Sequence, residues 1–78
     1  MYYHLYEVAI EDVILLGKLF NYYLLKKKKT DNDKIYILAD NFDKERKVYF
    51  YVGKFWTLQE MRKHAYSLHK EWLLYLGR

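Results

Sequence analysis

The chain has 78 residues, of which 53% are hydrophobic, and its formal net charge at pH 7 is +4. This length predicts a single domain over residues 1–78, and the hydrophobic content excludes an intrinsically disordered chain. The sequence contains no cysteine, which excludes disulfide bonds and zinc sites built on thiolates.

The N-terminal end lacks a basic segment followed by an apolar run, so we expect no signal peptide and a cytoplasmic protein. The longest apolar stretch, residues 13–25, is interrupted by Gly17, Lys18 and Asn21 and is shorter than the roughly 20 residues of a membrane-spanning helix. No interaction with a membrane is therefore expected. Residues with AT-rich codons (Phe, Tyr, Met, Ile, Asn and Lys) number 34, against nine for Gly, Ala, Arg and Pro, which indicates an AT-rich bacterial, phage or plasmid genome.

The N-terminal third of the chain carries two overlapping patterns. Residues 2–10 show the alternation of a strand, whereas from Val13 to Tyr23 apolar residues recur at helical spacing after a suitable N-cap at Asp12. We prefer a strand followed by a helix, because a third strand would stabilise a two-stranded sheet. Two alternatives stay open: one long first helix, or a strand at residues 19–26 that forms a three-stranded meander.

Four of the eleven lysines form one run, from Lys26 to Lys29. A run of like charges is usually a solvated segment, and here it would also suit the negative end of the preceding helix. The alternative role is contact with phosphates, which would weaken as the salt concentration rises. Residues 30–33, with the sequence Thr-Asp-Asn-Asp, are of the types that favour a turn, and we expect one there.

A β-hairpin is predicted at residues 34–40 and 47–52, which are rich in β-branched and aromatic residues. Alternation places Tyr36, Tyr49 and Tyr51 on one face of this hairpin. The first helix would cover that face if the tyrosines are ordinary strand residues. We expect the C-terminal helix on the opposite, apolar face, which carries Ile35, Ile37, Ala39, Val48, Phe50 and Val52.

The C-terminal helix has the strongest local signals. Residues 57–60 form a capping box, and apolar residues then recur at spacings of three and four, which predicts a helix over residues 58–76 that ends at Gly77. The run from Trp72 to Leu76 is apolar all round, so part of it lies outside a single packing seam and indicates self-association or a partner surface.

Together these elements predict an α+β fold. It consists of a small antiparallel sheet of two or three strands, in the preferred order β-α-β-β-α, with the amphipathic C-terminal helix packed on one face.

The hairpin leads into the helix through a Gly-x-Phe-x-Thr step at Gly53, Phe55 and Thr57. Over residues 34–70 this succession resembles the arm-type DNA-binding domains of phage integrases. The resemblance implies a sheet that lies in the major groove of DNA. The residues at the DNA would be Tyr36, Lys47, Tyr49 and Tyr51. The chain departs from that family through its hydrophobic strands and the lack of dense basic residues on the sheet.

No group of residues points to a reaction. His64 and His69 are five residues apart, so they diverge on a helix and do not share a metal ion. Ser67 is the only serine and lies in mid-helix, away from the strained turn that exposes a hydrolase nucleophile. The three glycines are isolated, so no phosphate-binding loop exists. We therefore expect no enzymatic activity, no metal and no cofactor.

Binding is the remaining class of function. Tyrosine has an apolar ring and a polar tip, and it suits surfaces that are wet alone and buried in a complex. We expect a non-catalytic protein that contacts a protein partner through Tyr36, Tyr49, Tyr51, Trp72, Leu74 and Tyr75.

Such a protein fits a phage- or plasmid-encoded accessory factor or inhibitor of a host machine, such as a nucleic-acid defence complex. The positive charge argues against DNA mimicry and favours steric or allosteric blockade. The alternative is a nucleic-acid-binding module that uses the hairpin tyrosines and Lys26, Lys27, Lys28, Lys29 and Lys47. A homodimer is compatible with either function.

Overall fold

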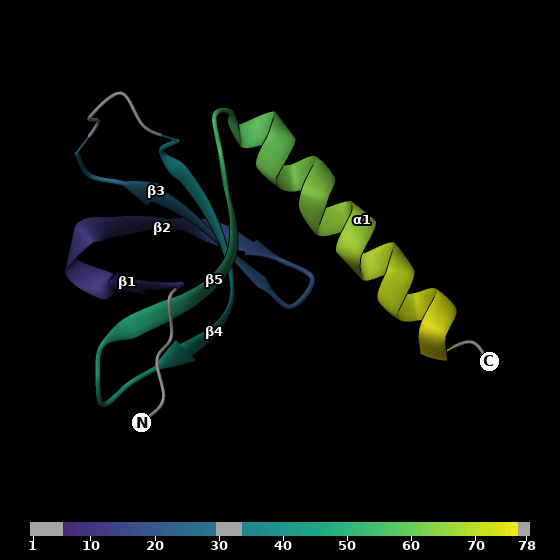
Figure 1. The fold of residues 1–78 in the computed structure, drawn as a ribbon, viewed down its shortest axis with the longest axis horizontal. Helices are drawn as coiled ribbons and strands as arrows, with labels where there is room; N and C mark the ends of the chain where they lie inside the picture. The colour runs from purple at the N-terminus through teal and green to yellow at the C-terminus, as the bar shows by residue number, and fades with distance from the viewer. Residues whose placement is uncertain (1–5, 30–33, 77–78) are drawn as a thin grey trace.

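A computed structural model describes residues 6–29 and 34–76, with side chains described through Leu74. It contains a five-stranded antiparallel sheet followed by one helix, α1 (Leu58–Leu76), packed on it (Figure 1). The strands are β1 (Glu7–Ala9), β2 (Val13–Leu19), β3 (Tyr22–Lys27), β4 (Tyr36–Asp43) and β5 (Val48–Phe55). The predicted α+β class is confirmed, whereas the prediction of two or three strands is wrong.

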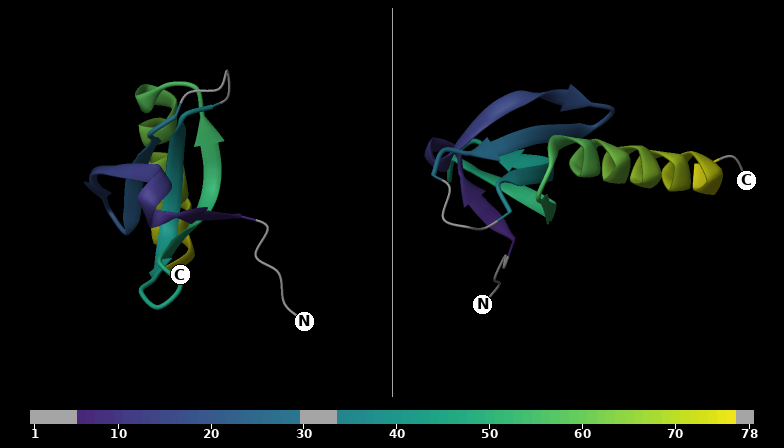
Figure 2. Two further views of the ribbon diagram at one scale, coloured as in Figure 1. Left: turned by 90° about the vertical axis from the view of Figure 1, so that its left-hand side faces the viewer. Right: turned by 90° about the horizontal axis from the view of Figure 1, so that it is seen from above.

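The sheet curls on itself. Its strand order is β1-β5-β4-β3-β2, so β1 and β2 lie at opposite edges although only the 3-10 helix η1 (Ile10–Asp12) joins them. So short a link spans roughly 14 Å at most, and the two edges must therefore approach each other (Figure 2). The N–H of Ile10 donates to the C=O of Lys47 at 2.9 Å, and the N–H of Lys28 donates to the C=O of Asp12 at 3.0 Å. These two bonds tie η1 to both sides of the curl.

The helix predicted after Val13 is wrong, because this segment forms the hairpin of β2 and β3. In β3 the apolar residues face both clusters, with Leu25 in one and Leu24 in the other. In β2 the three successive residues Ile14, Leu15 and Leu16 are apolar although they are exposed. A strand of this kind loses its alternation and cannot be told from a helix by periodicity. The alternative strand at residues 19–26 agrees in part with β3. Of the strand expected at residues 2–10, β1 occupies three residues, and residues 1–5 lie outside the described part.

Two hydrophobic clusters stabilise the fold, one on each face of the sheet. The first fills the inside of the curl and includes Val13 from β2, Leu25 from β3 and Tyr49 from β5, all buried. Val8 of β1 packs against the same cluster, so both edge strands close over it. The second cluster lies between the sheet and α1.

The register of β4 and β5 decides which residues face α1. Tyr36 pairs with Phe55 and Leu38 with Gly53, but the pairing then shifts at Leu38/Ala39 and again at Ala39/Asn41. Each shift changes which side chains share a face. Tyr36 and Leu38 lie before both shifts and share a face by alternation; they pack in the cluster under α1, whereas Ile37 lies in the other cluster. The prediction that α1 lies on the face of Ile37 is therefore wrong.

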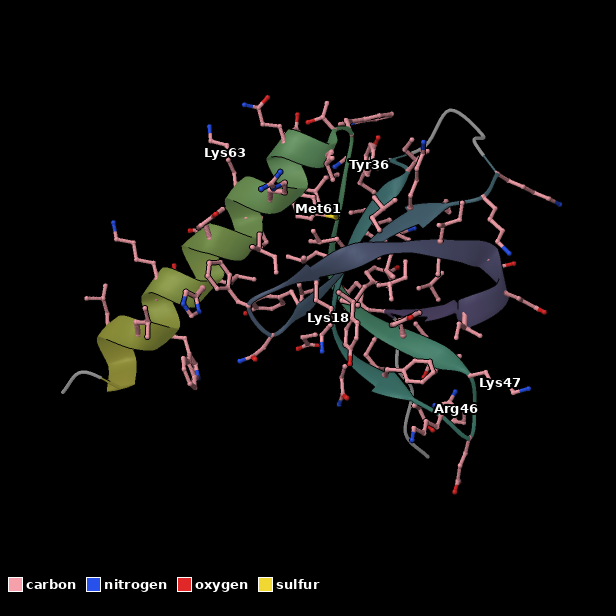
Figure 3. The ribbon with its side chains drawn as sticks, turned by 180° about the vertical axis from the view of Figure 1, so that it is seen from behind. Lys18, Tyr36, Arg46, Lys47, Met61 and Lys63 are labelled. Carbon is pink, nitrogen blue, oxygen red and sulfur yellow. The ribbon has the colours of Figure 1, made fainter. Side chains whose placement is uncertain are left out.

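Local signals explain where α1 begins. The Oγ1 atom of Thr57 accepts a hydrogen bond from the N–H of Glu60 at 3.1 Å, which confirms Thr57 as the N-cap. Met61 and Ala65 are fully buried against Leu38 of β4. Figure 3 shows Met61 pointing into the sheet while Lys63 points away from it.

Candidate functional site

The structure separates the three hairpin tyrosines that were predicted to form one surface. Tyr36 lies in the cluster under α1, whereas Tyr49 and Tyr51 belong to the cluster inside the curl. Tyr49 is only 6% exposed, and burial raises the pKa of its phenol, with a smaller contribution from Tyr23. The prediction that these tyrosines share one face is therefore wrong, because the two register shifts in the hairpin divide them.

Aromatic side chains paired with lysines line the rim of the curl. The Nζ atom of Lys18 lies 4.9 Å from the ring centre of Tyr23, and that of Lys54 lies 5.4 Å from the ring centre of Tyr51. Tyr6, which is exposed, packs edge-on against Tyr51 at 5.7 Å. These contacts form a basic and aromatic rim distinct from the lysine run.

The lysine run does not form one basic surface. Because neighbouring strand residues point to opposite faces, Lys26 and Lys27 diverge, and the Nζ atom of Lys26 lies 5.8 Å from the ring centre of Tyr36. The next three lysines line a hollow of about 310 Å³ together with Glu11 and Asp12, whose carboxylates offset their charge. Lys47 contacts η1 through its backbone, since its C=O accepts a hydrogen bond from the N–H of Ile10. The expected role of the run at the end of a helix is wrong, because β3 precedes it.

The turn between β2 and β3 supports the middle of α1. The ring of Phe20 stacks on His69 with 3.7 Å between the ring centres and 8° between the planes. The same ring meets Tyr66 edge-on at 5.1 Å. Phe20 holds these contacts with a φ of 58°, a left-handed conformation that is uncommon for a bulky residue.

Beyond this support, α1 projects away from the sheet (Figures 1 and 2). Trp72 is 51% exposed, Leu73 51% and Leu74 65%, so three successive apolar side chains face solvent. We call the segment of these three residues the helix overhang. The predicted partner residues Trp72 and Leu74 lie in it, whereas the side chain of Tyr75 lies outside the described residues.

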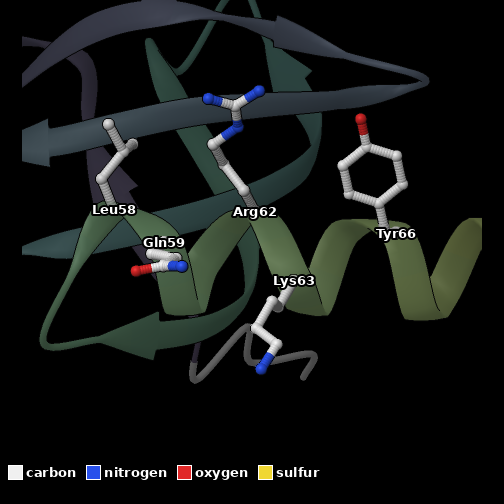
Figure 4. A pocket seen from close by; sticks show the side chains of 5 residues that line it. All are labelled: Leu58, Gln59, Arg62, Lys63 and Tyr66. Carbon is white, nitrogen blue, oxygen red and sulfur yellow. The ribbon is translucent and has the colours of Figure 1, made fainter.

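A groove runs along one flank of α1. One part, of about 540 Å³, is lined by Leu58, Arg62 and Tyr66, which Figure 4 shows projecting from the same side of the helix. The second part, of about 710 Å³, lies beside the β2–β3 turn and extends to Leu73. Tyr66 and Lys63 line both parts, so they are continuous. We call this feature the flank groove.

The charges of α1 are divided between its two flanks. Among the described residues, Arg62, Lys63 and Lys70 line the flank groove and no acidic residue does. On helical periodicity Glu60 and Glu71 lie on the opposite flank. In agreement with this placement, Glu71 acts on the phenol of Tyr22, whose pKa is raised by burial, by Asp40 and by Glu71.

The flank groove and the support from Phe20 were not predicted from the sequence. Leu58, Arg62, Tyr66 and Leu73 are spaced by four, four and seven residues, which places them on one side of a helix. This second stripe was visible in the sequence next to the apolar stripe that packs on the sheet. Phe20 gave no such signal, because its contact with α1 depends on where the β2–β3 turn lies.

Other kinds of site find no support in the described ranges. Among residues 6–29 and 34–74, no three His, Cys, Asp or Glu side chains gather to hold a metal ion. His64 packs against Phe55 at 5.2 Å and His69 stacks on Phe20, so both rings take part in packing. In the part of the chain that the structure describes, no helix is long and apolar enough to cross a membrane.

Comparison with known proteins gives no match. No protein family, no curated protein and no solved structure is significantly similar to this chain.

Proposed function

We propose that this chain is a non-catalytic protein-binding module whose contact surface includes the helix overhang. The observation that carries the proposal is the exposure of Trp72, Leu73 and Leu74 by at least half on a helix that projects from the sheet. Single exposed apolar residues are ordinary, but three successive ones, which point about 100° apart around a projecting helix, present apolar surface on several sides for a partner to bury.

The energetics of α1 support this proposal. Its first half is stabilised by the cluster around Met61 and Ala65, whereas none of the three overhang residues belongs to either of the described hydrophobic clusters. A helix that is apolar all round is normally buried. A partner would provide that burial, and a central tryptophan is the kind of anchor that dominates interface energies.

The biological role we propose is that of a phage- or plasmid-encoded accessory factor or inhibitor. A helix that projects from a small folded sheet suits steric blockade of a larger machine. The net charge of +4 argues against mimicry of nucleic acid.

Affinity capture from a lysate of the source cells tests the proposal. We expect the wild type to retain a protein that the Trp72→Ser/Leu74→Ser variant does not retain, because both anchors would be lost. The control is Trp56→Ser/Val52→Ser, which removes an exposed tryptophan and an exposed aliphatic residue elsewhere. Equal capture by all three proteins, or no captured protein at all, would count against the proposal.

A second candidate is single-stranded nucleic-acid binding at the rim of the curl. The lysine–tyrosine pairs Lys18/Tyr23 and Lys54/Tyr51 favour it, because aromatic rings stack bases and lysines contact phosphates. Gel retardation that weakens steeply between low and physiological salt, and that is lost in Lys18→Gln/Lys54→Gln, would support it.

A further inference from the structure

We propose that the flank groove of α1 binds an acidic amphipathic helix of a partner protein. This inference rests on the proposed protein-binding function and specifies the chemistry of the partner. It uses residues that the helix overhang test leaves unchanged.

The length of the groove suits a helix. Its two parts join at Tyr66 and run from Leu58 to Leu73, a length of about 22 Å at the rise of an α-helix. That length corresponds to roughly four helical turns. Leu58 at one end of the groove, Leu73 at the other and Phe20 from the β2–β3 turn form its apolar floor. Such a floor suits the apolar stripe of an amphipathic helix.

The charges of the groove select an acidic partner. Arg62, Lys63 and Lys70 line it, while the acidic residues of α1 lie on the other flank. A partner helix whose apolar stripe is bordered by Glu or Asp would place carboxylates beside these three cations. Charge complementarity of this kind fixes orientation and raises the rate of association.

A second copy of this chain fits the groove less well. In a two-fold symmetric contact each copy presents the same surface, so the three cations of one copy would lie against the cations of the other. Like charges placed together oppose association. Nucleic acid also fits poorly, because phosphates would lie on the aliphatic floor formed by Leu58 and Leu73.

Fluorescence anisotropy with three synthetic peptides tests the proposal. The peptides share one leucine stripe over about four turns and carry Glu, Gln or Lys beside it. We expect the affinities to fall in the order Glu, Gln, Lys, with about a tenfold difference between the first and the last at low salt. The difference should shrink as salt is added, because the cations are exposed.

Variants locate the binding to the groove. Lys63→Glu should weaken binding of the Glu peptide and strengthen binding of the Lys peptide. Lys44→Glu makes the same change of charge in the exposed β4–β5 turn and should leave both affinities unchanged. Tyr66→Ser should weaken all three peptides because it removes part of the floor. Equal affinities for the three peptides, or an order unaffected by Lys63→Glu, would overturn the proposal.

Two further outcomes would assign the groove to another occupant and would also overturn it. One is a dimer in sedimentation that Tyr66→Ser dissociates. The other is retardation of DNA or RNA that Lys63→Glu abolishes.

If the peptides show no preference but lysate capture still depends on Trp72 and Leu74, this inference fails and the proposed function stands. If capture does not depend on those two residues, the proposed function fails instead.

Discussion

At the scale of single residues, Phe20 shows how strain and packing are balanced. Its backbone adopts a φ of 58°, which costs a residue with a Cβ atom roughly 1 kcal/mol relative to glycine. In return its ring contacts both His69 and Tyr66 of α1. The ring contacts of Phe20 with α1 therefore offset the strain in the turn, and they support the helix at the point where the sheet ends.

Two substitutions at Phe20 separate these effects. Phe20→Ala keeps the strain and loses the ring, and we expect it to lower the free energy of unfolding by ~2 kcal/mol. Phe20→Gly also loses the ring but removes the strain, so it should recover ~1 kcal/mol of that loss. Urea denaturation measures both. A Phe20→Gly variant less stable than Phe20→Ala would show that the backbone is not strained.

The raised pKa values of two tyrosines indicate that the folded state becomes less stable at high pH. The pKa of Tyr22 and that of Tyr49 are raised, chiefly by burial, so the folded state holds both phenol protons more tightly than the unfolded chain. Their contribution is complete below the unfolded pKa of about 10 and is lost as the pH rises through the higher folded values. We expect the urea midpoint to fall above about pH 10, and to fall less in Tyr22→Phe/Tyr49→Phe. An identical decline in both proteins would contradict this assignment.

At the scale of elements, the two halves of α1 have different tasks. Met61 is fully buried under the first half, and Met61→Ala should lower the free energy of unfolding by ~3 kcal/mol because it leaves a cavity. Trp72→Ser/Leu74→Ser should change it by less than ~0.5 kcal/mol, because both side chains face solvent. Thermal and urea unfolding of the two variants check this contrast. A comparable loss in both would mean that the overhang packs on the fold.

The elements also show which parts of the fold could be read from the sequence. The predictions for α1 and its cap were confirmed because the signals at Thr57, Glu60 and Met61 all lie within two turns of each other. The number of strands could not be read, because neither β2 nor β3 alternates: the apolar residues of β3 face both clusters, and β2 carries three successive exposed apolar residues.

The candidate site could be predicted only where it depends on local sequence. Trp72 and Leu74 were identified because the run is apolar all round, and both are exposed in the structure. The hairpin tyrosines were misplaced, because strict alternation contains no sign of the two register shifts between β4 and β5. Such shifts depend on pairing between strands and leave no trace in either strand alone.

At the scale of the whole molecule, the fold separates stability from recognition. The curled sheet encloses one cluster of its own, and a second cluster fixes the first half of α1 to its outer face. The helix overhang therefore extends from a support that does not need it, whereas the flank groove shares with that support the ring contacts of Phe20 with Tyr66 and His69. This separation is the central claim, because it leaves an apolar and basic helix surface available to a partner protein.

Site-specific photo-crosslinking in the source cells tests that claim most directly. A photo-crosslinking residue is placed at Leu74 in the overhang, at Tyr66 in the flank groove or, as the control, at Lys44 in the β4–β5 turn. We expect positions 74 and 66 to crosslink to the same protein and position 44 to form no crosslink to it. Crosslinks from position 44 alone, or crosslinks from position 74 to nucleic acid, would contradict it.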